Sequence, residues 1–199
     1  MRTILCVTGP MAAGKNAAAA ILERKGFFSI DADLFVHEAV TKAAPRILEA
    51  FAEPAKARNI ILTLPDGSID RRALGRLIFP DPVLLAEQES IVYPVLTGLV
   101  RTCMTSHADR SIILNATVLY KTPDLMNMCS RIVYIDAPAV IRFFRAKTRD
   151  RMKTIQILQR FHSQADLLHR YTQTGIPVSR IMNTGNLDDL EQKLNSLLF

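Results

Sequence analysis

The 199-residue sequence is predicted to fold as an α/β domain built on a doubly wound parallel sheet. Short apolar runs alternate with longer helix-like stretches along the chain, which is typical of a parallel sheet covered on both faces. The first apolar run leads through a glycine-flanked loop into an alanine-rich stretch that ends at Gly26, a helix-stop signal. The length suits one domain with a sizeable core.

The first half of the chain is expected to contain two strands and several helices. The expected strands are "RTILCVT" (2–8) and "FFSIDAD" (27–33), with the helix "KNAAAAILERKG" (15–26) between them. A helical pattern continues through Val40 and again over 45–51. An irregular segment, 54–68, with the turn "PDG", then leads to the amphipathic stretch "DRRALGRLIF" (70–79), which stops at the prolines of "PDP". A long helix over 83–106 contains Pro94, so a kink or break is expected there.

The second half repeats the alternation. Strands are expected in "RSIILNAT" (110–117), "SRIVYIDA" (130–137) and "VSRIMN" (178–183), with a helix-sized gap between the first two, helices over about 138–171, and a closing amphipathic helix "LDDLEQKLNSLL" (187–198).

The stretch "GPMAAGKN" (9–16) lies between the first strand and the first helix and fits the phosphate-binding pattern G-x-x-x-x-G-K-[S/T] except at its last position, Asn16. The glycines would let backbone N–H groups point at phosphate oxygens, and the Lys15 ammonium would reach the β- and γ-phosphates. A glycine turn that binds nothing is the simpler alternative. The candidate nucleotide-binding residues here are Gly9, Pro10, Met11, Ala12, Ala13, Gly14, Lys15, Asn16 and Ala17.

The second strand ends in the acidic sequence "IDAD". With a strand period of two, Asp31 and Asp33 are expected to point the same way, at the sheet edge where open α/β folds bind ligands. A carboxylate there would accept a proton from a substrate hydroxyl or hold water on Mg²⁺. Alternatively, Asp33 caps the next helix.

These motifs together resemble the dephospho-coenzyme A kinases, P-loop kinases that transfer the γ-phosphate of ATP to the ribose 3′-hydroxyl of dephospho-CoA. The resemblance runs over nearly the whole chain, through "GPMAAGKN", "IDAD", "DGSIDRRALGRLIF", "YP" (93–94), "RFFRAKTRDR" (142–151), Gln164 and "NTG" (183–185). The block "DGSIDRRALGRLIF" is the most specific, because generic nucleotide kinases lack it.

The resemblance implies ATP and Mg²⁺ as cofactors, dephospho-CoA as substrate and a set of site residues. Asp33 is implied as the base, with Lys15 and Arg145 also catalytic. Arg145 and Arg149 are implied as lid arginines, Asn183 and Gly185 as part of the adenine pocket, and Asn16 as a weak Mg²⁺ ligand. The substrate residues expected are Asp33, Arg71, Arg72 and Tyr93. The layout expected is one kinase domain, 1–199, with a helical substrate lobe over about 54–108 and a lid over about 145–165.

Two further expectations concern side chains on helices. Arg142, Arg145 and Arg149 recur at i, i+3, i+7, so one face could present three guanidiniums to phosphates, although such runs are usually solvated surface. The apolar residues of the block "DRRALGRLIF" are expected in the core; they are Leu74, Leu77, Ile78 and Phe79.

Five residues depart from the family's pattern: Asn16, Tyr93, Asn115, Thr117 and Lys121. Asn16 replaces a hydroxyl residue, and the change from Asp and Glu to Asn115 and Lys121 removes two carboxylates. Either the enzyme works with altered metal geometry, or the chain is a catalytically weak or silent nucleotide- or CoA-binding module. Another small-molecule P-loop kinase is a further alternative. The retained loop, Asp33 and the lid arginines favour the active enzyme.

Composition narrows the partners. A net charge of +6, with Arg about twice as frequent as Lys, suits an anionic partner. There is no Trp, and the 7% of aromatic residues form no RNA-binding pattern, so no nucleic-acid partner is expected. No charge-free apolar run approaches a membrane span, and three scattered cysteines indicate reduced thiols in a cytoplasmic protein. The sequence leaves the oligomeric state open.

Overall fold

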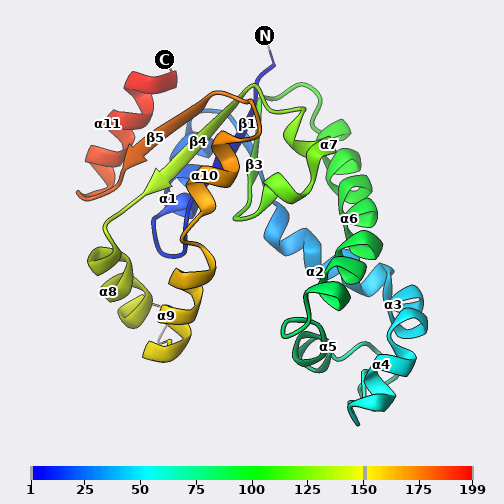
Figure 1. Ribbon diagram of the computed structural model, residues 1–199. Helices are drawn as coiled ribbons and strands as arrows, with labels where there is room; N and C mark the ends of the chain where they lie inside the picture. Colours follow the sequence, from blue (N-terminus) through cyan, green and yellow to red (C-terminus); the bar gives the residue numbers. More distant parts are fainter. Residues whose placement is uncertain (1, 150–151, 199) are drawn as a thin grey trace. The chain divides into compact units, whose positions relative to one another are not determined.

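The computed structural model describes residues 2–149 and 152–198 and confirms the α/β fold. Its sheet is five-stranded and parallel throughout, in the order β2-β3-β1-β4-β5 (Figure 1). The strands are β1 (Ile4–Thr8), β2 (Phe28–Asp31), β3 (Ile112–Asn115), β4 (Arg131–Asp136) and β5 (Val178–Met182). Because β1 lies at the centre, the loop that follows it starts in the middle of the sheet's carboxyl edge.

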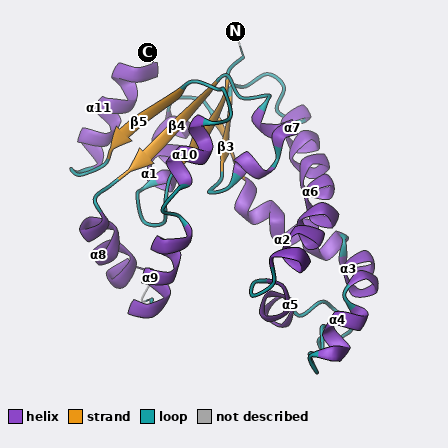
Figure 2. Cartoon of the chain, viewed as in Figure 1, coloured by secondary structure: helices purple, strands orange, loops and turns teal. Residues whose placement is uncertain are grey.

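The chain divides into two compact units. The first combines Met1–Ala32 with Met104–Phe199 and holds the sheet; the second is the helical segment Asp33–Cys103. Helices wholly in the first unit are α1 (Lys15–Arg24), the 3₁₀ turn η1 (Leu119–Lys121), α7 (Pro123–Met126), α8 (Ala139–Arg149), α9 (Thr154–Ser163), α10 (Leu167–Thr172) and α11 (Leu187–Leu198). The remaining helices are α2 (Ala32–Lys42), α3 (Ala44–Ala50), α4 (Ala52–Ala57), α5 (Arg71–Ile78) and α6 (Pro82–Thr105) (Figure 2).

In the first unit, helices cover both faces of the sheet. Alternate residues of β1, Leu5 and Val7, join a core cluster with side chains from α1 and α11. On the other face, Tyr171 of α10 lies edge-on to Tyr134, with ring centroids 6.3 Å apart. Burial raises the pKa of the Tyr171 hydroxyl well above its usual value, so this group remains a hydrogen-bond donor.

In the second unit, the specific sequence block folds as a capped helix. The Asp70 carboxylate accepts hydrogen bonds from the backbone N–H groups of Arg72 (2.9 Å) and Ala73 (3.1 Å), which fixes the start of α5. The expectation that Phe79 is a core residue is wrong: it is 73% exposed. Its ring lies over Gly75, where a Cβ would come within 2.9 Å of it.

Two helix expectations in this unit involve proline, and the first of them is wrong. Residues 54–57 are helical, because Pro54 lies in the first turn of α4, where a helix does not need the missing N–H. Pro94 does not break α6, which runs unbroken over 24 residues. A single proline removes one backbone hydrogen bond, and the turns on either side keep theirs.

Helix α6 also has an unusual composition. Within the described residues, it is the one helix that is long and apolar enough to span a membrane by length and composition alone. Its most apolar window has a mean hydropathy of 1.3 and is 28% buried. Core helices of soluble proteins meet the same criterion, and α6 carries Glu87, Glu89 and Arg101.

Candidate active site

The loop after β1 curls around two glycines at which any side chain would overlap a neighbouring group. At Gly9 a Cβ would overlap the Ile135 carbonyl oxygen on β4. Gly14 has φ +106, a left-handed conformation, and a Cβ there would overlap the Asn183 side-chain amide. Gly14 occupies the N-cap position of α1 and has no side chain with which to cap it. The first backbone N–H groups of α1 therefore have no side-chain cap, and they lie with the positive end of the helix dipole at the loop, as an anion-binding site requires.

The floor of the loop is tied to two of the predicted site residues. The buried Asn183 donates from Nδ2 to the Ala13 carbonyl at 2.8 Å, and its own N–H donates to the Asp136 carbonyl at 2.7 Å. Arg145 on α8 donates to the same Ala13 carbonyl at 3.4 Å. Residues more than 130 positions apart thus meet at one point of the loop, at the carboxyl edge of the sheet.

Gln164, in the segment between α9 and α10, contacts the same loop from the lid side. Its Oε1 accepts a hydrogen bond from the Met11 backbone N–H at 2.8 Å. Arg160 of α9 lies 3.9 Å from the Met11 sulfur. In this structure, a side chain of the predicted lid therefore accepts the hydrogen bond that one backbone N–H group of the loop donates.

Lys15, Asn16 and Asn115 form a connected polar group at the start of α1. Lys15 Nζ donates to Asn115 Oδ1 at 3.3 Å, and Asn115 Nδ2 donates to Asn16 Oδ1 at 3.1 Å. Asn115 is the last residue of β3 and is 3% exposed. Two of the five departures from the family's pattern are therefore in direct contact.

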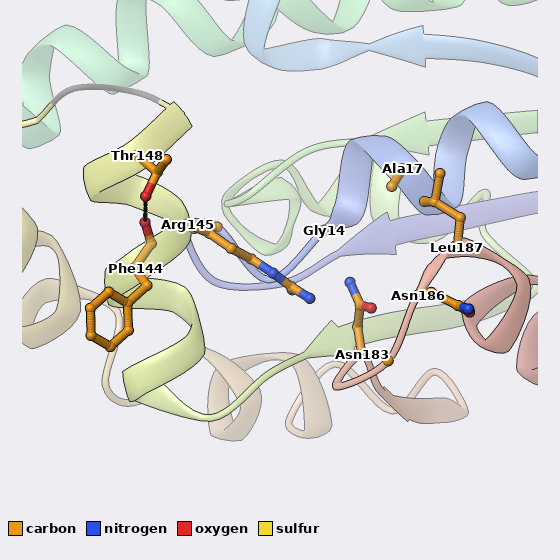
Figure 3. Close-up of a pocket in the computed structure, with 10 residues that line it drawn as sticks. Gly14, Ala17, Phe144, Arg145, Thr148, Asn183, Asn186 and Leu187 are labelled. Carbon is orange, nitrogen blue, oxygen red and sulfur yellow. Dashed lines mark hydrogen bonds between the residues drawn. The ribbon is translucent and has the colours of Figure 1, made fainter.

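A cavity of about 570 Å³ lies beside the loop, within the size range of ligand pockets. Figure 3 shows Arg145 and Asn183 directed toward each other near Gly14. The lining comes from the loop, the first turn of α1, α8, and the segment from β5 to the first residue of α11. It comprises Ala12, Gly14, Ala17, Phe144, Arg145, Thr148, Asn183, Gly185, Asn186 and Leu187. The predicted phosphate loop, Arg145 and the "NTG" residues Asn183 and Gly185 thus share one cavity.

Arg142, the first arginine of the predicted basic face of α8, has two described contacts. Its Nε donates to the Ala137 carbonyl at 3.0 Å, and its guanidinium lies 4.3 Å from the centre of the Phe161 ring. These contacts join Arg142 to the segment after β4 and to α9, and the expectation of three guanidiniums on one phosphate-facing side stays a prediction. The side chain of Arg149 lies outside the described residues.

The predicted substrate residues all belong to the second unit. Asp33 lies in the first turn of α2, because β2 already ends at Asp31; the expectation that both aspartates sit on one strand is therefore wrong. Arg71 and Arg72 are exposed in the first turn of α5, and Tyr93 is half-buried in α6. Their roles remain predictions.

Comparisons with known proteins decide which kinase family this is. The family model described as dephospho-CoA kinase matches residues 3–188. The chain belongs to the dephospho-CoA kinase family. The dephospho-CoA kinase of Treponema denticola is 33% identical over 195 residues, which cover 96% of this chain and 86% of that protein. The dephospho-CoA kinase of Treponema pallidum is 32% identical over 198 residues, or 98% and 93% of the two chains.

Solved structures share the fold. A crystal structure of a Thermus thermophilus protein matches with a TM-score of 0.81 and 25% identity, covering 99% of this chain and 96% of the other. A shikimate kinase from Acinetobacter baumannii matches with a TM-score of 0.52 at 18% identity, covering 100% and 93%, and supports the fold alone. The resemblance read from the motifs is therefore confirmed at the level of the dephospho-CoA kinase family.

The structure brings to the phosphate loop and its cavity several residues for which the sequence alone predicts no role. Gln164 belongs to the resemblance without an implied function, and Asn115 stands out in the sequence only as a departure from the family's pattern. Thr148, Asn186 and Leu187 line the cavity. Their nearness to Arg145 and to "NTG" in the sequence is a signal that could have indicated them.

Proposed function

We propose that this chain transfers the γ-phosphate of ATP to the 3′-hydroxyl of dephospho-CoA and so makes coenzyme A. The observation that carries the proposal is the joining of the phosphate loop to Arg145 and Asn183 around the Ala13 carbonyl. An idle glycine turn does not need a buried amide and an arginine that meet at one of its carbonyl groups. Membership in the dephospho-CoA kinase family supports the acceptor.

The nucleotide would lie with its phosphates on the loop and its adenine in the adjoining cavity. The backbone N–H groups and dipole of α1 would hold the phosphates, and Lys15 and Arg145 would neutralise the charge that spreads over the γ-phosphate oxygens during transfer. Asn183 and Gly185 would bound the adenine side. Phosphoryl transfer depends mainly on such positioning and electrostatic stabilisation.

Asp33, Arg71, Arg72 and Tyr93 would serve the acceptor. Asp33 would accept the proton of the ribose hydroxyl as that oxygen attacks phosphorus, since a carboxylate within hydrogen-bonding reach is the usual base in kinases. The two arginines would bind anionic groups of dephospho-CoA. We place the helical substrate lobe at about 54–108 and the lid at about 145–165, and expect the reaction in the cytoplasm without a nucleic-acid or membrane partner.

Magnesium would enter with the nucleotide. Protein sites for Mg²⁺ often use one or two oxygen ligands together with phosphates and water. The Asn16 carbonyl oxygen fits such a site, and Asp31 ends the strand beside Asn115, with their Cα atoms in register. When bound, the ion would neutralise charge on the β- and γ-phosphates. This chain's residues then have to hold the phosphates and exclude water.

One observation favours a second candidate function. Positions 16 and 115 carry two neutral amides, hydrogen-bonded to each other, in place of the hydroxyl and the carboxylate of the family pattern. A catalytically silent nucleotide-binding module would tolerate that loss.

Coupled measurement of ADP release separates the two functions. With ATP and Mg²⁺, we expect ADP to appear only when dephospho-CoA is added. Lys15→Ala should abolish that release while thermal unfolding stays near that of the wild type, because the lysine neutralises phosphate and packs little. Dephospho-CoA-independent ADP release, or wild-type turnover by folded Lys15→Ala, would contradict the proposal.

A further inference from the structure

The buried side chain of Asn115 is bonded at both ends. Its oxygen accepts from the Lys15 ammonium at 3.3 Å, and its nitrogen donates to Asn16 Oδ1 at 3.1 Å. Asn115 is 3% exposed and has almost no contact with solvent, so its polar atoms depend on these hydrogen bonds within the protein. The side chain connects the phosphate-binding lysine to the residue at the expected metal position.

The chemistry of these groups fixes their orientation. An ammonium only donates, so the Asn115 atom that faces Lys15 must be the oxygen, and its NH₂ group must then face Asn16. The Asn16 atom that accepts this bond must be its carbonyl oxygen. An aspartate at 115 has no N–H to donate. It would therefore leave the Asn16 oxygen facing a negative charge, or turn the Asn16 amide so that its nitrogen takes that place.

We propose that Asn115 is a positioning residue and that Asn16 and Asn115 act as a matched amide pair, which lets the loop bind nucleotide with little dependence on divalent metal. The proposal rests on the assignment of the loop as the ATP site. A carboxylate at 115 would form an ion pair with Lys15 and repel the phosphates, and a metal ion would be needed to offset that repulsion. The neutral amide holds Lys15 without either effect.

The pairing is tested by a double-mutant cycle read by ADP affinity. Asn115→Asp, Asn16→Ser and the double variant are compared with the wild type by calorimetry, once with EDTA and once with saturating Mg²⁺. We expect Asn115→Asp to weaken metal-free ADP binding by about tenfold, which corresponds to about 1.4 kcal/mol. The ratio of the metal-free Kd to the Mg²⁺-bound Kd should rise by about the same factor. The double variant, in which a serine hydroxyl can donate to the new carboxylate, should recover metal-free affinity beyond the product of the single effects by at least about threefold.

A matched control adds the same charge elsewhere. Asn127 is exposed and lies just before β4 begins, at the opposite edge of the sheet from the loop, so Asn127→Asp should leave both affinities unchanged. Additive effects in the cycle, or an Asn115→Asp variant whose Kd changes equally with and without Mg²⁺, would overturn the pairing. Because ADP binding needs no acceptor, these results are independent of whether dephospho-CoA is phosphorylated.

A second variant keeps the test decisive if Asn115→Asp does not fold, which a thermal melt would reveal. Asn16 is exposed, so Asn16→Ala should fold while leaving the buried Asn115 amide without its acceptor. We expect metal-free ADP affinity to fall at least about threefold, because Asn115 then holds Lys15 less firmly. Unchanged metal-free affinity in Asn16→Ala would also overturn the proposal.

Discussion

At the residue scale, Gly14 is the position where loop geometry and binding are most closely linked. Its φ of +106 disfavours any side chain, and a Cβ would also overlap the Asn183 amide that holds the loop. Gly14→Ala should therefore lower the free energy of unfolding by about 1–2 kcal/mol and weaken ADP binding by about tenfold or more. Urea unfolding and calorimetry measure the two effects.

Gly26 provides the control for that substitution. It has φ +96 at the other end of α1, and a Cβ added there would have nothing within 4 Å. Gly26→Ala should lose a similar amount of stability and keep its ADP affinity. Equal losses of affinity in the two variants would show that the Asn183 contact does not shape the loop.

At the element scale, Tyr171 of α10 holds the segment that follows β3. Its hydroxyl donates to the Thr117 carbonyl at 3.1 Å and accepts from the Leu119 N–H at 2.9 Å. Tyr171→Phe would leave the buried Leu119 N–H unpaired, so the free energy of unfolding should fall by about 1–3 kcal/mol. Tyr120→Phe, at a half-buried ring in η1, should cost less than about 1 kcal/mol. Urea unfolding that shows Tyr171→Phe as stable as the wild type would contradict this role.

The elements themselves are largely predictable from the sequence, and the departures have physical causes. The strands and the longer helices follow from their apolar periodicity, as in β1 and α11. The sequence pattern hides helix α4, because Pro54 indicates a break unless the helix start is known. It also extends the second strand to Asp33, because periodicity does not show that β2 stops two residues earlier.

Local sequence patterns predict only the consecutive residues of the candidate site, and the family resemblance adds Arg145, Asn183 and Gly185. The loop 9–17 follows from a local pattern, because spacing along one strand–turn–helix defines it. The bonds from Asn183 to Ala13 and from Gln164 to Met11 join positions 170 and 153 residues apart, and no local pattern encodes them. The pairing of Asn16 with Asn115 likewise depends on β3 lying beside β1 in the sheet.

At the scale of the whole molecule, the proposed reaction requires residues of both units. The first unit, with the sheet, holds the phosphate loop and its contacts, and the second, Asp33–Cys103, holds the predicted base and acceptor-binding arginines. A silent binding module would need the residues of the first unit to bind nucleotide, and it would need no base. The contribution of Asp33 to turnover, apart from binding, therefore distinguishes a kinase from a binder.

The most direct measurement is dephospho-CoA-dependent ADP release by the wild type and Asp33→Asn, on samples whose ADP affinity is also measured. The substitution keeps the size of the side chain and removes its negative charge and its capacity to accept a proton. We predict that kcat falls by about 10²-fold or more, the usual scale for a general base, while the Kd for ADP stays within about twofold. Equal turnover by the two proteins would contradict the role of Asp33, and a wild type that binds both ligands without releasing ADP would contradict the kinase itself.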